Sequence, residues 1–279
     1  DSSATVVKTG SGALTLSLLD GPTGKFGGTF RLDQGTLVLA DLYAQAVPFG
    51  SLVVGGSSTI RFDGTGVDIS AVLAPLAAGK TLTLDLPNSD VSFATGLSGA
   101  GSIVKVGAFK LNLAGASSLT AASTVLVSAG KLQLNGAGTL GAATLSIDGG
   151  EFINNSSASD LANPIRFGAT ASFSGGYGTT FSGPVTLAAD SAVTFTGDAN
   201  FTGVIGGAKA FNIKGAPYVQ VTLGGANTYT GGTIIDGTTV IAGNLAAFGT
   251  GAIRVNSNGS LDLGGLTLPN AITLAGGTI

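Results

Sequence analysis

Residues 103–135 read IVKVGAFKLNLAGASSLTAASTVLVSAGKLQLN, and their pattern recurs along most of the chain. Apolar and polar side chains alternate in short runs such as Leu111-Asn112-Leu113 and Leu132-Gln133-Leu134, which is typical of a β-strand with one buried face. Glycine-containing turn signals separate the runs. The step from the first run to the second nearly equals the step from Ile103 to Val125. The stretch therefore predicts a structure that repeats about every twenty residues.

Two interleaved series of apolar residues extend this repeat along the chain, each with a nearly regular interval of about 20 residues. The first series consists of Leu14, Leu37, Ile60, Leu82, Ile103, Val125, Leu145, Ile165, Val185, Val204, Val221, Val240 and Leu261. The second consists of Phe30, Leu52, Val72, Phe93, Leu111, Leu132, Phe152, Phe173, Val193, Phe211, Ile234, Ile253 and Ile272. We therefore predict an all-β fold, a right-handed parallel β-helix of about 12–13 coils of about 20 residues, each coil holding two or three short strands. Residues 1–279 are expected to form a single β-helix segment.

The alternative fold is an all-β sandwich or barrel built from hairpins. Strands in such folds recur every ~8–12 residues, and half of the observed repeat falls in that range. A hairpin fold needs no regularity at the longer period, however. The longer period therefore favours the β-helix.

The composition excludes several classes of function. Glycine supplies 47 of 279 residues, and charged residues make up only 10% of the chain while 44% is apolar. The chain has no Cys, His, Met or Trp, which excludes thiol nucleophiles, disulfides, zinc fingers and a Ser-His-Asp triad. With a net charge of −3, the chain lacks the basic surface that a nucleic-acid partner requires.

Four aspartates, Asp20, Asp41, Asp63 and Asp85, recur at a nearly constant interval that matches the local coil length. If the coils stack in register, their carboxylates form a column with steps of ~4.8 Å. One interpretation is that these are turn residues that cap strand ends. The other is a metal site, with Ca²⁺ as the cation, or the acid cluster of a polysaccharide-cleaving enzyme. Asp68 and Asp90 repeat the interval from Asp63 to Asp85.

Two further patterns are weighed against a structural explanation. Ser102-Ile103-Val104-Lys105 matches the SxxK pattern of a Ser-Lys nucleophile, but residues three apart on a strand face opposite sides, so no such pair is expected. The tyrosines are candidate carbohydrate-stacking residues or loop anchors: Tyr43, Tyr177, Tyr218 and Tyr229. Tyr177, among glycines, is the one expected to be most exposed.

Residues 221–233, which read VTLGGANTYTGGT, resemble the passenger-associated repeat of bacterial autotransporters. Asp236-Gly237-Thr238-Thr239-Val240-Ile241 approximates the usual continuation. The resemblance implies a type V secretion passenger that an outer-membrane β-barrel translocator exports and that folds outside the cell as a β-helix. The signal peptide and barrel of that family are not in this sequence. The resemblance therefore implies a fragment of a longer passenger.

These observations predict a secreted or cell-surface structural stalk or adhesin segment that is not an enzyme. Its ligand is expected to be a carbohydrate or protein of a host or of an extracellular matrix. A second copy of the chain, bound end to end, is the other expected partner. One alternative is a polysaccharide-active β-helix enzyme that uses the acidic column, with substrate contacts at Arg31, Arg61, Lys80 and Phe49. The other is a self-assembling extracellular fibre subunit.

Overall fold

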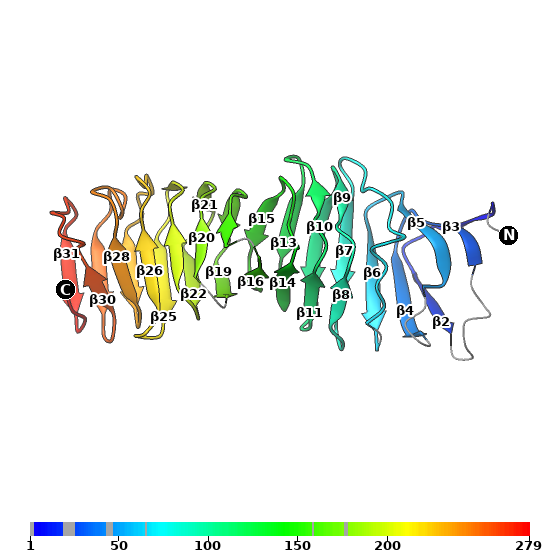
Figure 1. The fold of residues 1–279 in the computed structure, drawn as a ribbon, viewed down its shortest axis with the longest axis horizontal. Coiled ribbons are helices and arrows are strands. Elements are labelled where there is room, and N and C mark those ends of the chain that lie inside the picture. Colours follow the sequence, from blue (N-terminus) through cyan, green and yellow to red (C-terminus); the bar gives the residue numbers. More distant parts are fainter. Residues whose placement is uncertain (1–2, 19–25, 43–46, 65, 158, 176–177) are drawn as a thin grey trace. The chain divides into compact units, whose positions relative to one another are not determined.

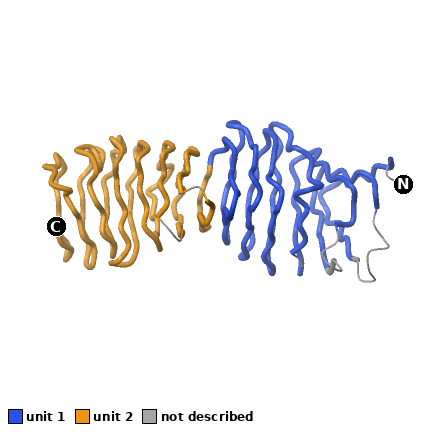
Figure 2. The backbone as a smooth tube through the Cα atoms, in the orientation of Figure 1, with its two compact units in different colours: residues 1–144 blue, residues 145–279 orange. Residues whose placement is uncertain are grey.

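A computed structural model of the chain describes residues 3–18, 26–42, 47–64, 66–157, 159–175 and 178–279. Within these ranges the regular elements are β-strands and no helix occurs, so no helix there is long and apolar enough to span a membrane. The strands stack as a parallel β-solenoid of about 12 coils that repeat roughly every 21 residues. This confirms the predicted all-β parallel β-helix and rejects the hairpin fold. The chain divides into two compact units, residues 1–144 and 145–279, each described separately below (Figure 2).

The first unit contains three sets of parallel strands. The first sheet takes its strands in chain order: β2 (Ala13–Leu18), β4 (Thr36–Leu42), β6 (Ser58–Asp63), β7 (Thr81–Asp85), β10 (Ser102–Val106) and β13 (Thr124–Val127). The second face of the coils carries β1 (Thr5–Lys8), β3 (Phe26–Leu32) and β5 (Phe49–Val54), and then β8 (Val91–Phe93), β11 (Lys110–Leu113) and β14 (Lys131–Gly136). The third is short, with β9 (Ser98–Gly99) beside β12 (Ser118–Leu119).

The second unit repeats this plan with a longer third sheet. Its first sheet contains β15 (Thr144–Ile147), β18 (Ile165–Phe167), β21 (Val185–Leu187) and β24 (Ile205–Gly206). Its second sheet contains β16 (Glu151–Ser156), β19 (Thr170–Gly175), β22 (Ser191–Phe195), β25 (Phe211–Gly215), β27 (Thr233–Asp236), β29 (Ile253–Asn256) and β31 (Ile272–Ala275). Its third sheet contains β17 (Asp160–Leu161), β20 (Thr179–Phe181), β23 (Ala199–Phe201), β26 (Gln220–Leu223), β28 (Thr239–Ala242) and β30 (Ser260–Asp262).

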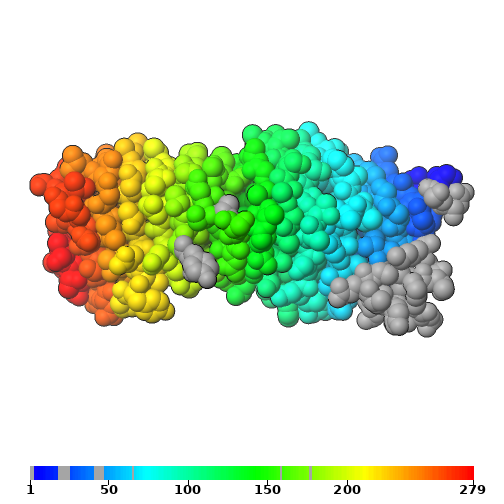
Figure 3. Space-filling view, viewed as in Figure 1, coloured from blue at the N-terminus to red at the C-terminus, as the bar shows by residue number. Residues whose placement is uncertain are grey.

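Strands far apart in sequence lie side by side because each coil pairs with the next. Within the second unit, Figure 1 shows β26 beside β28, and in Figure 3 the side chains of successive coils form adjacent bands of colour. Every backbone N–H or C=O that points along the stacking direction can thus bond to a neighbouring coil, which satisfies these groups without charged side chains. This explains how a chain with so few charges folds.

The interior of the first unit consists mainly of aliphatic columns, with two pairs of aromatic rings, Phe30 with Phe49 and Phe62 with Phe93. Leu37 pairs with Ile60, and Leu82 pairs with Ile103, which in turn pairs with Val125. All five side chains are at most 2% exposed. Because buried and outward-facing residues alternate, every second residue of a strand points into such a column, as the sequence pattern predicts.

The interior of the second unit contains a connected row of aromatic rings. Phe173 contacts the rings of Phe152, Phe167, Phe181 and Phe195 at centroid distances of 5.0 to 5.8 Å. The row continues from Phe181 to Phe201 at 4.6 Å, from Phe201 to Phe211 at 6.3 Å and from Phe211 to Tyr229 at 6.1 Å. Offset-stacked and edge-to-face arrangements at these distances are favourable beyond the burial of area alone.

Glycine is required where successive coils turn the same corner. Gly107 and Gly130 have φ angles of +80° and +64°, which residues with a Cβ rarely adopt. A Cβ at Gly107 would overlap the backbone of Leu86, and one at Gly130 would overlap the carbonyl oxygen of Gly107. Two successive corners thus stack backbone on backbone, which explains part of the high glycine content.

The structure corrects parts of the two predicted series. Val221, Val240 and Leu261 lie in the third sheet of the second unit rather than in the first. In the first sheet it is Ile205, not Val204, that pairs with Val185. The error has a physical cause: the first sheet ends at β24, and the third-sheet strands β26 and β28 show the same alternation of buried and outward-facing residues, so their apolar residues are easily assigned to the first series.

The second series also contains register errors. Phe93 pairs with Leu113 rather than Leu111. Val193 pairs with Ala171 rather than Phe173. Ile234 faces outward beside buried Thr233 and Ile235. In each case the strand offers two neighbouring candidates for the inward position, either two apolar residues or an apolar residue beside an inward threonine. The spacing along the sequence does not show which of the two points inward.

Candidate functional site

The four predicted metal ligands do not all fall within the described residues. Asp20 lies outside them, and Asp41 is placed only by its backbone in β4. Asp63 pairs with Ala40 and Asp85 with Arg61, so the strand register does not set Asp63 opposite Asp85. The cause is the length of the segment between β6 and β7. Ser58 pairs with Leu82, which is 24 residues later, whereas Asp63 and Asp85 are only 22 residues apart, so the two aspartates are out of register by two positions.

Asp63 and Asp85 have different partners. The Nδ2 of Asn88 donates to Asp63 Oδ1 at 2.6 Å, while Asn88 Oδ1 accepts the N–H of Gly64 at 2.8 Å. Asp85 lies 3.8 Å from Arg61 in a partly exposed ion pair. Across the described ranges, no group of three or more acidic side chains is arranged to hold a metal ion. Calcium binding at the four aspartates stays a prediction.

Other aspartates connect neighbouring coils at the corners. Asp68 Oδ1 accepts the N–H of Ser70 and its Oδ2 accepts the N–H of Ala94, both at 2.8 Å. Asp90 accepts the N–H of Lys110 at 2.8 Å. The same bond to the following coil recurs in the second unit, from Ala169 to Asp148, from Ala210 to Asp190 and from Gln220 to Asp198. These contacts match the interpretation of the aspartates as strand-end caps.

Three of the four proposed substrate contacts of the enzyme alternative have partners within the fold. Phe49 is 4% exposed and stacks on Phe30 at 5.6 Å, inside the core. Arg31 donates to Asp33 at 2.6 Å, and Arg61 faces Asp85. Phe49 is therefore not available to a substrate, because its ring is covered by its own fold.

Lys105 is the unexpected charged group of the interior. Its side chain lies in the column between Leu84 and Val127 and is fully buried. Its ammonium donates to the carbonyl oxygens of Val106, Gly107 and Ala129 at 2.7, 2.9 and 3.3 Å. Desolvation lowers the pKa of Lys105 from 10.5 to about 8, and the charges of Asp85 and Asp90 oppose this shift.

The orientation of Lys105 confirms that Ser102 and Lys105 form no nucleophile pair, because Ser102 occupies an outward position of the same strand. Sequence reasoning nevertheless missed the significance of Lys105. The signal was present in the alternation itself, which places Lys105 on the same face as Ile103. Lys8 shows the same local pattern, with its ammonium donating to the carbonyls of Thr9, Gly10 and Gln34.

The motif at residues 221–233 holds three coils together through Asn227. The Oδ1 of Asn227 accepts the N–H of Ile205 at 2.7 Å, and its Nδ2 donates to the carbonyl of Ala247 at 2.6 Å. Ile205 belongs to the preceding coil and Ala247 to the following one. Asn227 is 4% exposed, so both bonds are shielded from water and each leaves an unsatisfied backbone group if broken.

Tyr229 closes the end of the aromatic row. Its ring is fully buried, and its hydroxyl shares a 2.6 Å hydrogen bond with the Oγ1 of Thr233. Burial raises the pKa of Tyr229, and the bond to Thr233 partly offsets this effect. Gly231 lies at a position where a Cβ would overlap the backbone of Lys209, so a larger residue does not fit there. The polar and glycine positions of the motif therefore have structural roles in coil stacking.

An open pocket of about 460 Å³ lies on the second unit beside Tyr218. Tyr218 is 81% exposed, whereas Tyr229 is buried and therefore not available for carbohydrate stacking. Tyr43 and Tyr177 lie outside the described residues, so the expected exposure of Tyr177 stays a prediction. The pocket is lined by Thr194, Phe195, Thr196, Lys214, Gly215, Ala216, Tyr218, Asp236 and Gly237.

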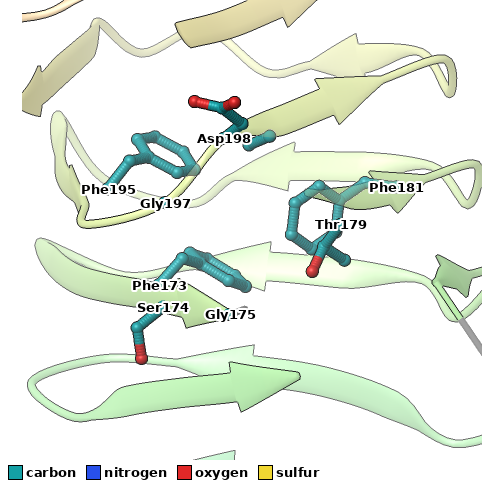
Figure 4. A pocket seen from close by; sticks show the side chains of 9 residues that line it. Phe173, Ser174, Gly175, Thr179, Phe181, Phe195, Gly197 and Asp198 are labelled. Atoms are coloured by element: carbon teal, nitrogen blue, oxygen red, sulfur yellow. The ribbon is translucent and has the colours of Figure 1, made fainter. Parts of the chain in front are cut away.

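A second cavity lies inside the aromatic row but is very small. It has a volume of about 10 Å³ and is bordered by Phe173, Phe181 and Phe195, with Thr179 and Asp198 at its side (Figure 4). This is room for about one water molecule. A cavity of this size and lining is a packing gap rather than a ligand site.

The fold and these corner contacts define a class of protein: a parallel β-solenoid whose coils are joined by side-chain-to-backbone hydrogen bonds. No protein-family model matches the chain, and neither the curated proteins nor the solved structures give a match.

Proposed function

We propose that this chain is a structural, non-catalytic segment of a secreted bacterial surface protein of the autotransporter passenger type. The observation that carries the proposal is the motif at residues 221–233. The positions that give it its resemblance to passenger repeats, Asn227 and Tyr229 in particular, are those that join or fill successive coils. A repeat with such a role is what an extracellular scaffold built from stacked coils requires.

Two physical features support export in an unfolded state and folding outside the cell. The chain contains no cysteine, so no disulfide forms early to block passage of the chain. Its contacts lie mainly between neighbouring coils, and such a solenoid folds by adding one coil to the previous one. Extracellular location and dependence on a translocator belong to this proposal.

Surface display tests the proposal. The chain would be placed between a signal peptide and the β-barrel of a known autotransporter and expressed in a Gram-negative host. We expect the chain to reach the cell surface, where external protease removes it and an antibody labels intact cells. A matched fusion that carries Asn227→Ala should be displayed but degraded faster, because a coil junction is lost. Retention of the wild-type chain inside cells that display a known passenger would reject the proposal.

The two alternative functions give different results on the purified chain. An enzyme that used the acidic residues would lose polysaccharide cleavage on combining Asp63→Asn with Asp85→Asn, whereas a scaffold has no such activity to lose. A fibre subunit would form filaments of varied length in electron micrographs. We expect neither cleavage nor filaments.

A further inference from the structure

The most exposed aromatic side chain among the described residues of the second unit, that of Tyr218, sits on a rigid turn. In the turn Ala216–Val219 the N–H of Val219 donates to the carbonyl of Ala216 at 2.9 Å, with Pro217 and Tyr218 at the central positions. Pro217 fixes its own φ angle. Val219 is 1% exposed, and its carbonyl accepts bonds from Thr238 Oγ1 at 2.9 Å and from the N–H of Thr239 at 3.1 Å. Tyr218 is therefore held outward by a turn whose far end is anchored to the next coil.

Hydrogen-bonding side chains stand beside this ring on three successive strands. The register pairs Thr194 of β22 with Lys214 of β25, and Lys214 with Asp236 of β27. All three point outward, and they line the same open pocket as Tyr218. Because they project from paired strands rather than from a loop, their spacing is fixed by the stacking of the coils.

The charges of the pocket nearly cancel. The Nζ of Lys214 lies 3.8 Å from Asp236 Oδ2, and each of these side chains is about two-fifths exposed. A phosphate or carboxylate ligand would meet Asp236, and a cationic ligand would meet Lys214. A neutral ligand with several hydroxyl groups can accept from the ammonium and from Thr194 while it donates to the carboxylate, so this arrangement favours polyols over ions.

We propose that this pocket, here called the Tyr218 pocket, is a carbohydrate-binding subsite that takes a neutral pyranose ring. The ring of the sugar stacks on the exposed face of Tyr218, whose π-face attracts polarised C–H groups. The sugar hydroxyls bond to Lys214, Asp236 and Thr194. A volume of about 460 Å³ lies within the ordinary range for small-molecule sites. The inference rests on the proposed surface function, to which it adds a ligand class and a place of binding.

The experiment uses the purified full chain labelled with ¹⁵N and four probes: the methyl glycosides of glucose, galactose and mannose, and N-acetylglucosamine. We expect at least one of them, at millimolar concentration, to shift the amide signals of Tyr218, Lys214 and Gly237 in a saturable manner. Tyr218→Ala should weaken this binding about tenfold or abolish it. Tyr218→Phe keeps the ring and should stay within about threefold of wild type.

Two further variants separate the contributions in the pocket. Lys214→Gln and Asp236→Asn remove one charge each and should weaken binding about threefold to tenfold, because a charged hydrogen bond is replaced by a neutral one. Leu245→Ala is the matched control, since Leu245 is 57% exposed in the same unit and does not line the pocket. It should bind as the wild type does.

The proposal is overturned if none of the four probes shifts these amides, which is also the result that a protein ligand at this surface would give. It is equally overturned if Tyr218→Ala binds a probe as tightly as Leu245→Ala. Surface display of Tyr218→Ala distinguishes the two proposals. Normal display with lost sugar binding leaves the scaffold function intact, whereas failed display of the wild type rejects that function independently of any binding.

Discussion

The two units fill the same coil geometry with different chemistry. In the first unit, aliphatic columns surround one buried lysine, Lys105, whose charge is satisfied by three carbonyl groups. In the second unit, a connected row of phenylalanines ends at a buried tyrosine, Tyr229. Both solutions occupy inward positions of parallel strands. The strand register therefore defines where a core residue goes, and it leaves the choice of residue type open.

The largest expected difference lies in the aromatic row. Phe173→Ala should lower the free energy of unfolding by about 3–5 kcal/mol, because Phe173 contacts four other rings. Phe93→Ala in the first unit removes a ring that pairs with Phe62, and should cost at least about 1 kcal/mol less, since each aromatic pair adds ~0.5–1.5 kcal/mol beyond area burial. Urea unfolding followed by far-ultraviolet circular dichroism measures both.

A surface ring provides the control for that pair. Phe109 is 41% exposed, and Phe109→Ala should change stability by less than about 1 kcal/mol. Equal losses for Phe173→Ala and Phe93→Ala would show that the contacts within the aromatic row add nothing to burial.

The next largest effect is expected at Asn227. Asn227→Ala leaves the N–H of Ile205 and the carbonyl of Ala247 without their side-chain partners inside the fold, and should lower stability by about 2–4 kcal/mol. Asn155→Ala, at an exposed position of the same unit, should have little effect. Hydrogen exchange should locate the damage, with faster exchange of the Ile205 amide in Asn227→Ala. An unchanged exchange rate there would contradict the assigned role.

The buried ionisable groups predict opposite responses to alkaline pH. The folded chain lowers the pKa of Lys105 from 10.5 to about 8, so between these pH values the unfolded chain binds more protons than the folded one. Stability from this group therefore rises from pH 8 to 10.5 and is lost as pH falls through 8. Relative to Lys105→Met, the wild type should gain about 3 kcal/mol across this window.

Tyr229 should act in the other direction. Its pKa is raised in the folded chain, so its contribution is complete below pH 10 and declines as the unfolded chain loses the phenolic proton above that value. Unfolding measured at a series of pH values for Lys105→Met, Tyr229→Phe and the wild type separates the two contributions. A parallel pH dependence for all three chains would show that neither group titrates differently on unfolding.

The smallest expected difference concerns the corners, where the units are alike. Asp90 and Asp190 each accept an N–H from the corresponding position of the following coil, at Lys110 and Ala210. Asp90→Ala and Asp190→Ala should each cost about 1 kcal/mol, the usual net contribution of one hydrogen bond. If chemical denaturation shows similar losses of stability for the two variants, the two units differ in their cores and not at their corners. A loss more than about twice as large at one corner would extend that contrast to the surface.

Much of the fold was predictable because inward and outward residues alternate. Runs such as Leu111-Asn112-Leu113 identified the strands and their period, and Leu111 does pair with Leu132. The third sheet was not predicted as a separate face, since strands such as Ser98–Gly99 contain too few residues to show alternation. Val221 and Val240 lie in longer third-sheet strands that alternate as first-sheet strands do, so their regular spacing led to assignment to the wrong sheet.

The candidate sites were harder to predict for a related reason. The column of Asp63 and Asp85 depended on a constant interval, and the longer segment between β6 and β7 shifts these two carboxylates out of register. The Tyr218 pocket joins residues of β22, β25 and β27, which belong to three successive coils, so its composition is visible only once the coils are stacked. Tyr218 itself was a candidate from sequence, whereas Thr194 and Lys214 carried no distinguishing signal.

The aspartate corners also have a direction. In each corner bond from an aspartate to the next coil, the carboxylate belongs to the earlier coil and the N–H to the later one. Removal of one such carboxylate therefore frees an N–H of the following coil, so the damage falls on the carboxyl-terminal side of the coil that carried the aspartate.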